Sequence, residues 1–273
     1  MKVLSGLVAT ALAASLSGCI SAATLMKLKA DGSGTIEQKI LMNTQAMEAM
    51  MQSMAGAMGG QVKAGAPKTA KELLSEAELK AAAARMGKGV RFVSSQRVTE
   101  GAMDGVAAVY AFDDVNTVRI DENPPTPGAG PAPTARRKPV AFNYVKQGTG
   151  GVLTIHMPDE PRPAARSTGA AAPAQMNPQM LAMMQKMFEG MHIVIDVEVD
   201  GTIVKTNADY VTGSRVTLVE LDMGDLMKDP KQFEKLQGLG PGASFSDVKP
   251  LLKDVKGVKL NGPTVSIEFA PRF

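Results

Sequence analysis

The chain has 273 residues, of which 44% are hydrophobic, so it is long and apolar enough to bury a sizeable core. Aromatic residues make up only 4%, tryptophan is absent and methionines number 19, which predicts a core of aliphatic and thioether side chains. The 30 basic and 27 acidic residues nearly cancel, so the sequence lacks the positive excess that is typical of nucleic-acid-binding proteins, and we expect no nucleic-acid partner.

Residues 1–18 have the layout of a secretory signal peptide, with Lys2 ahead of an apolar, uncharged run over 3–16. The run is shorter than the roughly 20 apolar residues that cross a bilayer. It ends in a tetrad that resembles the bacterial lipobox: Leu16, Ser17, Gly18 and Cys19. The resemblance implies cleavage after Gly18 and a lipid on the Cys19 thiol, so that residues 19–23 form a lipidated membrane anchor.

Cys19 is the only cysteine of the chain and cannot form an internal disulfide, so lipidation accounts for its presence. The alternative is an ordinary signal peptide cut after Ala22 or Ala23, which would leave no anchor. Two or three acyl chains would hold the protein persistently, because each buried methylene contributes ~0.8 kcal/mol. Ile20, rather than aspartate, follows the cysteine. This resembles export and sorting to the outer membrane if the host is Gram-negative.

The first folded segments read as a β-hairpin, with strands over 22–29 and 35–42 on either side of a turn at 30–34. The turn also resembles the middle of an EF-hand loop. Alignment puts Lys29 and Ile40 at positions that require carboxylates, which excludes calcium. Next, Ser75 and Glu78 form a capping box that opens a helix running to residue 86. Strands are predicted over 90–98 and 106–112.

Two helices with a methionine face are predicted, because methionines recur there with a period near 3.6 residues. The first helix starts near Thr44 and ends at 59–60, and the second is capped by Asn177. Their similar spacing indicates either an internal duplication or convergence on a methionine-rich composition. The strands around the helices do not align, which favours convergence. The candidate apolar ligand face consists of Met47, Met50, Met51, Met54, Met180, Met183, Met184 and Met187.

Stretches rich in glycine, alanine and proline predict flexible loops near 59–72, 122–139 and 157–176. A hairpin over 140–156 lies between the last two. We expect this hairpin to pair into the main sheet, because an isolated two-stranded hairpin is marginal in water. We interpret the three stretches as loops of one domain over 24–273 rather than as linkers between domains.

The C-terminal third predicts an antiparallel meander over 192–199, 202–206 and 215–221, with a tight turn at Asp200-Gly201. A helix over 229–238, a short turn at 250–255 and a last strand over 264–269 follow. The predicted fold class is α+β. We expect one mostly antiparallel sheet of about six to eight strands, covered on one face by the Met-rich amphipathic helices, with long Pro-rich loops.

Several of these features are similar to the LppM-like bacterial lipoproteins. They are the signal and lipobox, the turn at 31–34 and the runs 201–207 and 213–217. The resemblance implies an α+β domain with a curved antiparallel sheet and lipid or glycolipid binding in the envelope. The Met-rich helices and the Pro-rich loops are not part of that pattern.

No group of residues in the sequence indicates an enzyme. His156 and His192 each fall on a strand, where a histidine is more often structural than catalytic. There is no Gly-x-Ser-x-Gly elbow, and the glycines at 238–242 lack the lysine and hydroxyl of a phosphate-binding loop. Asp113-Asp114 precedes a helical turn and is explained as its cap. We therefore expect no catalytic residues and no cofactor.

The methionines carry the unusual chemistry of this sequence, and three interpretations stay open. They pack the core in place of aromatics, or they line an adaptable apolar pocket, or they bind Cu(I) as soft ligands. We predict a non-catalytic, lipid-anchored envelope lipoprotein that binds lipid or an envelope protein. The alternatives are an extracytoplasmic Cu(I)-binding protein that uses the Met-rich helices, and a purely structural envelope assembly lipoprotein.

Overall fold

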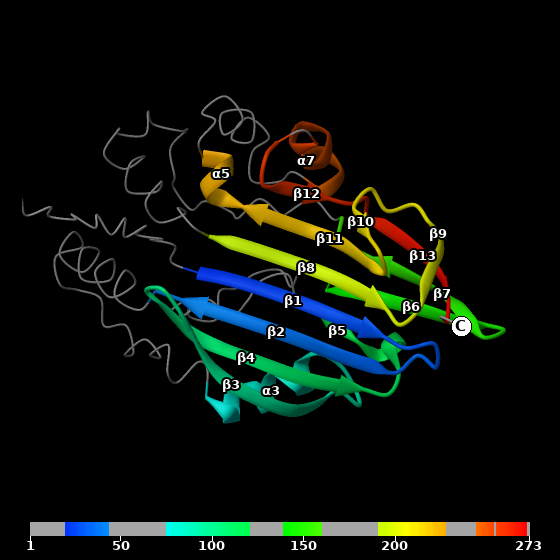
Figure 1. Cartoon of the computed structure of the whole chain (residues 1–273), viewed down its shortest axis with the longest axis horizontal. Coiled ribbons are helices and arrows are strands. Elements are labelled where there is room, and N and C mark those ends of the chain that lie inside the picture. The colour runs from blue at the N-terminus through cyan, green and yellow to red at the C-terminus, as the bar shows by residue number, and fades with distance from the viewer. Residues whose placement is uncertain are drawn as a thin grey trace, which may run out of the picture.

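The computed structural model describes residues 20–43, 75–120, 139–159, 191–227, 244–253 and 255–271. Thirteen strands in this part of the chain form two sheets (Figure 1). Sheet A has eight strands: β1 (Ile20–Leu28), β2 (Gly34–Met42), β3 (Arg91–Glu100), β4 (Met103–Phe112), β8 (His192–Val199), β10 (Val211–Thr212), β11 (Arg215–Asp222) and β12 (Val258–Leu260). Sheet B has five: β5 (Arg119–Ile120), β6 (Val140–Gln147), β7 (Gly150–His156), β9 (Thr202–Thr206) and β13 (Thr264–Ala270).

The strand order in sheet A is β10-β11-β8-β1-β2-β4-β3, and β12 also pairs with β11. Neighbouring strands are antiparallel except for β1 and β8, which run parallel. The β1–β8 pair joins residues that lie far apart in the sequence at the centre of the sheet. In sheet B the order is β5-β6-β7-β13-β9, with antiparallel neighbours throughout.

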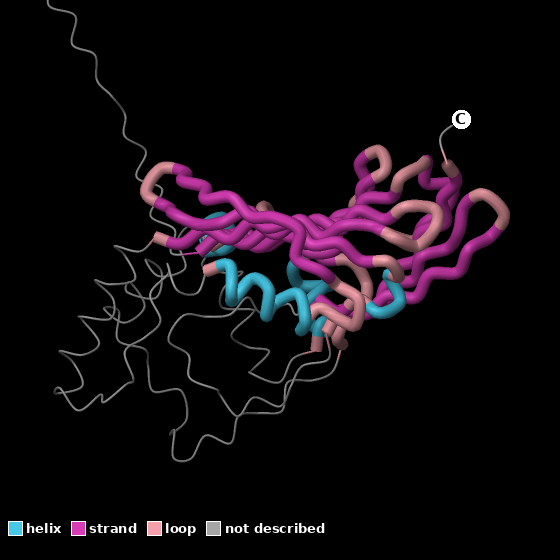
Figure 2. Tube along the Cα trace, turned by 90° about the horizontal axis from the view of Figure 1, so that it is seen from below, coloured by secondary structure: helices cyan, strands magenta, loops and turns pink. Residues whose placement is uncertain are grey.

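The helices of the described residues are few and short. They are α3 (Glu76–Arg85), α5 (Met223–Met227) and α7 (Phe245–Leu252), with a 3₁₀ turn η1 (Val115–Thr117) between β4 and β5. Figure 2 shows α3, the longest of them, on one side of sheet A. The predicted α+β class is therefore wrong: the described fold is mostly β, with two sheets. Both predicted Met-rich helices lie outside the described residues, so none of the described helices is one of the helices predicted to cover the sheet.

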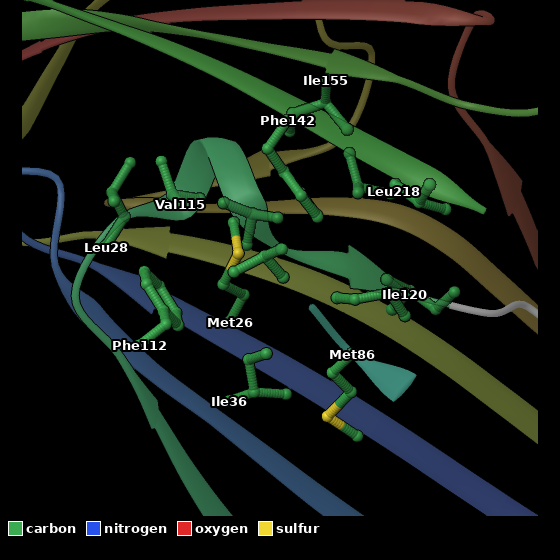
Figure 3. Packing of buried hydrophobic residues seen from close by; sticks show 14 of the residues in the cluster. Met26, Leu28, Ile36, Met86, Phe112, Val115, Ile120, Phe142, Ile155 and Leu218 are labelled. Atoms are coloured by element: carbon green, nitrogen blue, oxygen red, sulfur yellow. The ribbon is translucent and has the colours of Figure 1, made fainter. Parts of the chain in front are cut away.

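One core joins the two sheets. Met26 and Phe112 contribute from sheet A, Phe142 and Ile155 from sheet B, and η1 places Val115 between them (Figure 3). All five are at most 4% exposed. Alternate residues of β1, β4, β7 and β8 enter this core, as the two-residue period of a strand requires. Because fully burying a side chain of this size contributes roughly 1.5–3 kcal/mol, the contact between the sheets is a main source of stability.

Local signals for several elements are confirmed. β1 and β2 form the predicted hairpin, and β3 and β4 occupy the predicted strand positions. The Ser75 side chain accepts a hydrogen bond from the Glu78 backbone N–H at the start of α3. Asp114 accepts one from the Asn116 N–H and caps η1, as the sequence predicts.

Three predictions about the C-terminal half are wrong. The hairpin of β6 and β7 pairs into sheet B, where β13 continues it, and not into the sheet of β1. β9 does not pair with β8 across Asp200-Gly201; it crosses to β13 in sheet B, and β8 pairs with β11. The short turn expected at 250–255 is the end of α7, whose capping box joins Ser244 and Asp247.

Candidate functional site

Several segments outside the described residues join the fold at one end of sheet A. Ile20 opens β1 and pairs with Met42, the last residue of β2. His192 opens β8 and pairs with Ser21 on one side and with Asp222 on the other. We call Ile20, Met42, His192 and Asp222 the anchor edge. It lies at the left end of sheet A in Figure 1.

Buried side chains and a backbone hydrogen bond hold the anchor edge. Met42 is only 3% exposed, and Asn43 beyond it is also buried. Met191, just before β8, accepts a hydrogen bond of 2.9 Å from the Met223 N–H at the start of α5. These contacts fix the points at which the chain enters and leaves sheet A.

Every residue that the sequence predicts to form a binding or attachment site lies outside the described residues. This holds for the signal peptide, for Cys19 and for both methionine faces. These segments are nevertheless joined covalently to residues at or next to the anchor edge. Cys19 directly precedes Ile20, the first methionine segment follows Asn43, and the second ends at Met191. Lipid attachment, an apolar pocket and Cu(I) binding all stay predictions. The residues concerned are Leu16, Ser17, Gly18, Cys19, Met47, Met50, Met51, Met54, Met180, Met183, Met184 and Met187.

The methionines of the described residues include a group that packs the core. Met26 and its companions are each no more than 8% exposed, and they come from strands of sheet A and from the loops after α3 and β7. For these side chains the core-packing interpretation is confirmed. They are Met26, Met42, Met86, Met103 and Met157.

The two histidines do not share a site. His156 ends β7 in sheet B, whereas His192 opens β8 in sheet A. Within the described ranges, no group of three or more histidine, cysteine, aspartate or glutamate side chains is placed to hold a metal ion. Of the helices in this part of the chain, none combines the length and apolar character that crossing a bilayer needs.

Charged side chains on the outer face of sheet A, the face away from the shared core, form cross-strand pairs. Lys27 Nζ lies 2.6 Å from Glu37 Oε1, and Arg215 donates to Glu198 over 2.7 Å. At the start of β3, Arg91 donates to Asp113 and lowers the pKa of that carboxyl from its usual value. Because these charges alternate in sign, the face offers no single-sign patch for a polyanion or a polycation.

Two buried polar atoms were not predicted from the sequence. The Tyr110 residue is fully buried, and its hydroxyl has no hydrogen-bond partner among the described residues. Its ring packs edge-on against Phe92, with centroids 6.0 Å apart, and burial raises the pKa of the phenol to about 12. On the outer face, Oδ1 of Asp196 also lacks a partner in the described part, and Arg215 lies 3.8 Å from the other carboxylate oxygen. A tyrosine or aspartate in a strand pattern gives no signal of such an unpaired atom.

Searches of protein-family models and of curated proteins find no match to this chain. Among solved structures, the chain is similar to the folded domain of the LppM protein of Mycobacterium tuberculosis, determined by NMR. The alignment covers 94% of this chain and 92% of that one, with a TM-score of 0.32 and 9% sequence identity. The likeness is weak, and no sequence comparison supports a shared family. It does not carry an argument about the activity of this chain.

Proposed function

We propose that this protein is a non-catalytic, lipid-anchored lipoprotein of the bacterial cell envelope. The lipobox-like tetrad that ends in Cys19 supports the anchor, since this single cysteine stands where a diacylglycerol would be attached. Two or more acyl chains give stable membrane attachment, whereas a single chain gives only marginal and reversible binding. Outer-membrane sorting in a Gram-negative host is part of this proposal, because Ile20 follows the cysteine.

The observation that carries the proposal is the position of β1. Its first residue, Ile20, directly follows Cys19 and already pairs with Met42. Consecutive Cα atoms are about 3.8 Å apart. A lipid on Cys19 would therefore hold sheet A at the membrane surface with almost no linker, and ligands in or on the membrane would be more accessible than freely diffusing ones.

The proposed ligand is a membrane lipid or an envelope protein. Both methionine segments are joined covalently to the anchor edge, one through Asn43 and the other through Met191. Methionine side chains are flexible and polarizable, and proteins use them at surfaces that adapt to varied apolar ligands. Apolar side chains next to a lipid anchor would thus meet acyl chains or a membrane-embedded partner first.

Metabolic labelling with a radioactive fatty acid tests the anchor. The wild-type chain should be labelled and sediment with membranes, and Cys19→Ala should lose both the label and the sedimentation. Ser17→Ala is the matched control, because it changes the tetrad but keeps the cysteine and a small residue before Gly18, so it should be labelled like wild type. Label that persists on Cys19→Ala would contradict the proposal.

Native mass spectrometry of the chain, extracted from membranes in mild detergent, tests the lipid ligand. A lipid-binding protein should carry additional, non-covalent lipid masses beyond the covalent modification. Substitution of Met47, Met50 and Met51 by glutamine should remove these masses, and substitution by leucine should keep them. Extracted protein without any bound lipid would contradict the lipid ligand and leave the envelope protein as the proposed partner.

A further inference from the structure

β3 is the longest free edge strand in the described part of the molecule. It has ten residues and ends sheet A beside β4 (Figure 1). The other described edges are short: β5 and β10 have two residues each, β12 has three and β9 has five. Short edges protect a sheet against unwanted pairing, as do proline, lysine and β-bulges. β3 contains neither proline nor lysine, and its one irregularity lies between Phe92 and Ser94.

The turn after β3 determines which backbone groups of the strand are free. Gly101 has φ +60°, Ala102 does not have positive φ, and Glu100 pairs with Met103. A two-residue hairpin turn with glycine first is type II′, and the residues that close it exchange ladder hydrogen bonds. Such pairs alternate with non-bonded pairs along an antiparallel ladder. The backbone N–H and C=O groups that point away from sheet A are therefore those of Ser95, Arg97 and Thr99.

Arg97 is the charged residue of this edge that has no partner among the described residues. Arg91 is bound to Asp113 and Glu100 to Lys39, so the other charges of the strand are neutralised within the fold. The Arg97 side chain is exposed and takes part in no hydrogen bond or ion pair with the described part of the chain. A residue added opposite Arg97 would meet an uncompensated positive charge at a position with free backbone groups.

A second copy of the chain does not supply the missing negative charge. In antiparallel pairing of β3 with itself, residues with outward-pointing backbone groups must face one another. Arg97 would then face Ser95, Arg97 or Thr99 of the other copy, depending on the register. Glu100 is the one acidic residue of the strand. Its backbone groups point toward β4 rather than outward, so it cannot pair with Arg97 of the other copy. The charge pattern therefore favours a different polypeptide.

We propose that β3 is a docking edge, which accepts an extended segment of another protein as an added antiparallel strand with an aspartate or glutamate opposite Arg97. Main-chain hydrogen bonds from Ser95, Arg97 and Thr99 provide affinity, and the charge pair fixes the register, as in other cases of strand addition. The inference rests on the proposed binding role for its biological setting. The test below measures peptide binding at β3 only. A negative result would therefore leave the proposed lipid anchor unaffected.

The test uses the full chain in detergent and a fluorescent nine-residue peptide of alternating threonine and valine with a central glutamate. Fluorescence anisotropy should show that this peptide binds about five- to tenfold more tightly than one with a central lysine, since one charge pair is gained and one repulsion avoided. Arg97→Glu should reverse the preference. Lys205→Glu, which changes an exposed basic residue on the edge strand β9, is the matched control and should leave the preference unchanged.

A second pair of variants tests the backbone contact. Ser95→Pro removes one outward N–H that the fold does not use, and proline is tolerated at such positions of edge strands. It should abolish peptide binding while the far-UV circular dichroism spectrum and the melting temperature stay close to wild type. Ser95→Ala should bind like wild type. Three results would overturn the proposal: no binding of the glutamate peptide at millimolar concentration, binding retained by Ser95→Pro, or a dimer of the chain that Ser95→Pro dissociates.

Discussion

Replacing Tyr110 by phenylalanine should stabilise the protein, although the residue lies in the core. The phenol is fully buried between Ile36 and Phe92 on neighbouring strands, and its hydroxyl has no partner among the described residues. A buried hydroxyl without a hydrogen bond costs roughly 1–3 kcal/mol. Phenylalanine keeps the ring and its edge-on contact with Phe92, so we expect the free energy of unfolding at pH 7 to rise by about 1 kcal/mol.

The same substitution should flatten the response to alkaline pH. Burial raises the pKa of Tyr110 from 10.0 to about 12 in the folded state, against the opposing effect of the nearby Arg85 charge. Below pH 10 the phenol is neutral in both the folded and the unfolded state, so its ionisation does not lower the free energy of unfolding. Between pH 10 and pH 12 the unfolded chain ionises first, so stability falls by about 1.4 kcal/mol per pH unit. The wild type should lose about 2 kcal/mol over this range, a loss that Tyr110→Phe should not show.

Urea unfolding followed by far-UV circular dichroism measures both effects. The difference between Tyr110→Phe and wild type should be about 1 kcal/mol at pH 7 and should widen to about 3 kcal/mol at pH 12, the sum of the two contributions above. Every other ionisable group is common to both proteins, so its contribution cancels in the difference. The reasoning would be refuted if Tyr110→Phe lost 1 kcal/mol or more at pH 7, or if the difference stayed constant above pH 10.

Three further substitutions should destabilise the fold, each through a different contact. Tyr144→Phe should cost about 1 kcal/mol by urea unfolding, because the Tyr144 hydroxyl donates over 2.8 Å to the Ala30 carbonyl and ties sheet B to the β1–β2 turn; an unchanged midpoint would contradict this role. Asn261→Ala should lower the free energy of unfolding by about 2–3 kcal/mol. The fully buried Asn261 amide accepts from the Asp209 N–H and donates to the Thr217 carbonyl. A loss below half of that value would mean that water replaces the amide. Gly105→Ala should lower the melting temperature more than Gly262→Ala, because a Cβ at 105 would lie 1.9 Å from the Ile40 carbonyl oxygen, whereas at 262 the nearest atom, Lys249 Nζ, lies 3.8 Å away. Equal shifts would exclude a steric cause.

Elements with a strong local signal could be predicted from the sequence. The β1–β2 hairpin follows from two alternating strands around a glycine turn, and Asp31 stabilises that turn by accepting from the Ser33 N–H over 2.9 Å. The caps at Ser75 and Asp114 follow from residue types next to helical segments. Each of these signals lies within a few residues of the structure that it produces, so no knowledge of the distant chain is needed.

The division into two sheets could not be predicted, because it depends on contacts between distant residues. Asp200-Gly201 reads as a hairpin turn, but it is a corner at which the chain leaves sheet A for sheet B. Asp200 donates to the Leu28 carbonyl, and a Cβ on residue 201 would lie 2.2 Å from the Ala270 carbonyl oxygen. The glycine is needed for this close approach of β13, a reason that the local pattern does not reveal. The parallel pairing of β1 with β8 is equally non-local.

The candidate site shows the same limit in a different form. The lipobox-like tetrad and the methionine stripes are local patterns, so the sequence identifies them, and they lie outside the described residues. The β3 edge could not be identified in advance, because its free backbone groups depend on β3 being last in the order of sheet A. Arg97 on its own reads as one more exposed cation; its lack of a partner becomes evident only when Arg91 and Glu100 are seen to be paired.

The central place of β1 in sheet A suits a short lipid tether mechanically. β1 lies between β2 and β8 and pairs with them over nine and eight register positions. A pull on Cys19 along the strand would load both ladders in shear, so that many hydrogen bonds would have to break together. The same pull on an edge strand would load one ladder only. A lipid attached one residue before a central strand can therefore follow the motion of the membrane without peeling the sheet apart from Ile20 onwards.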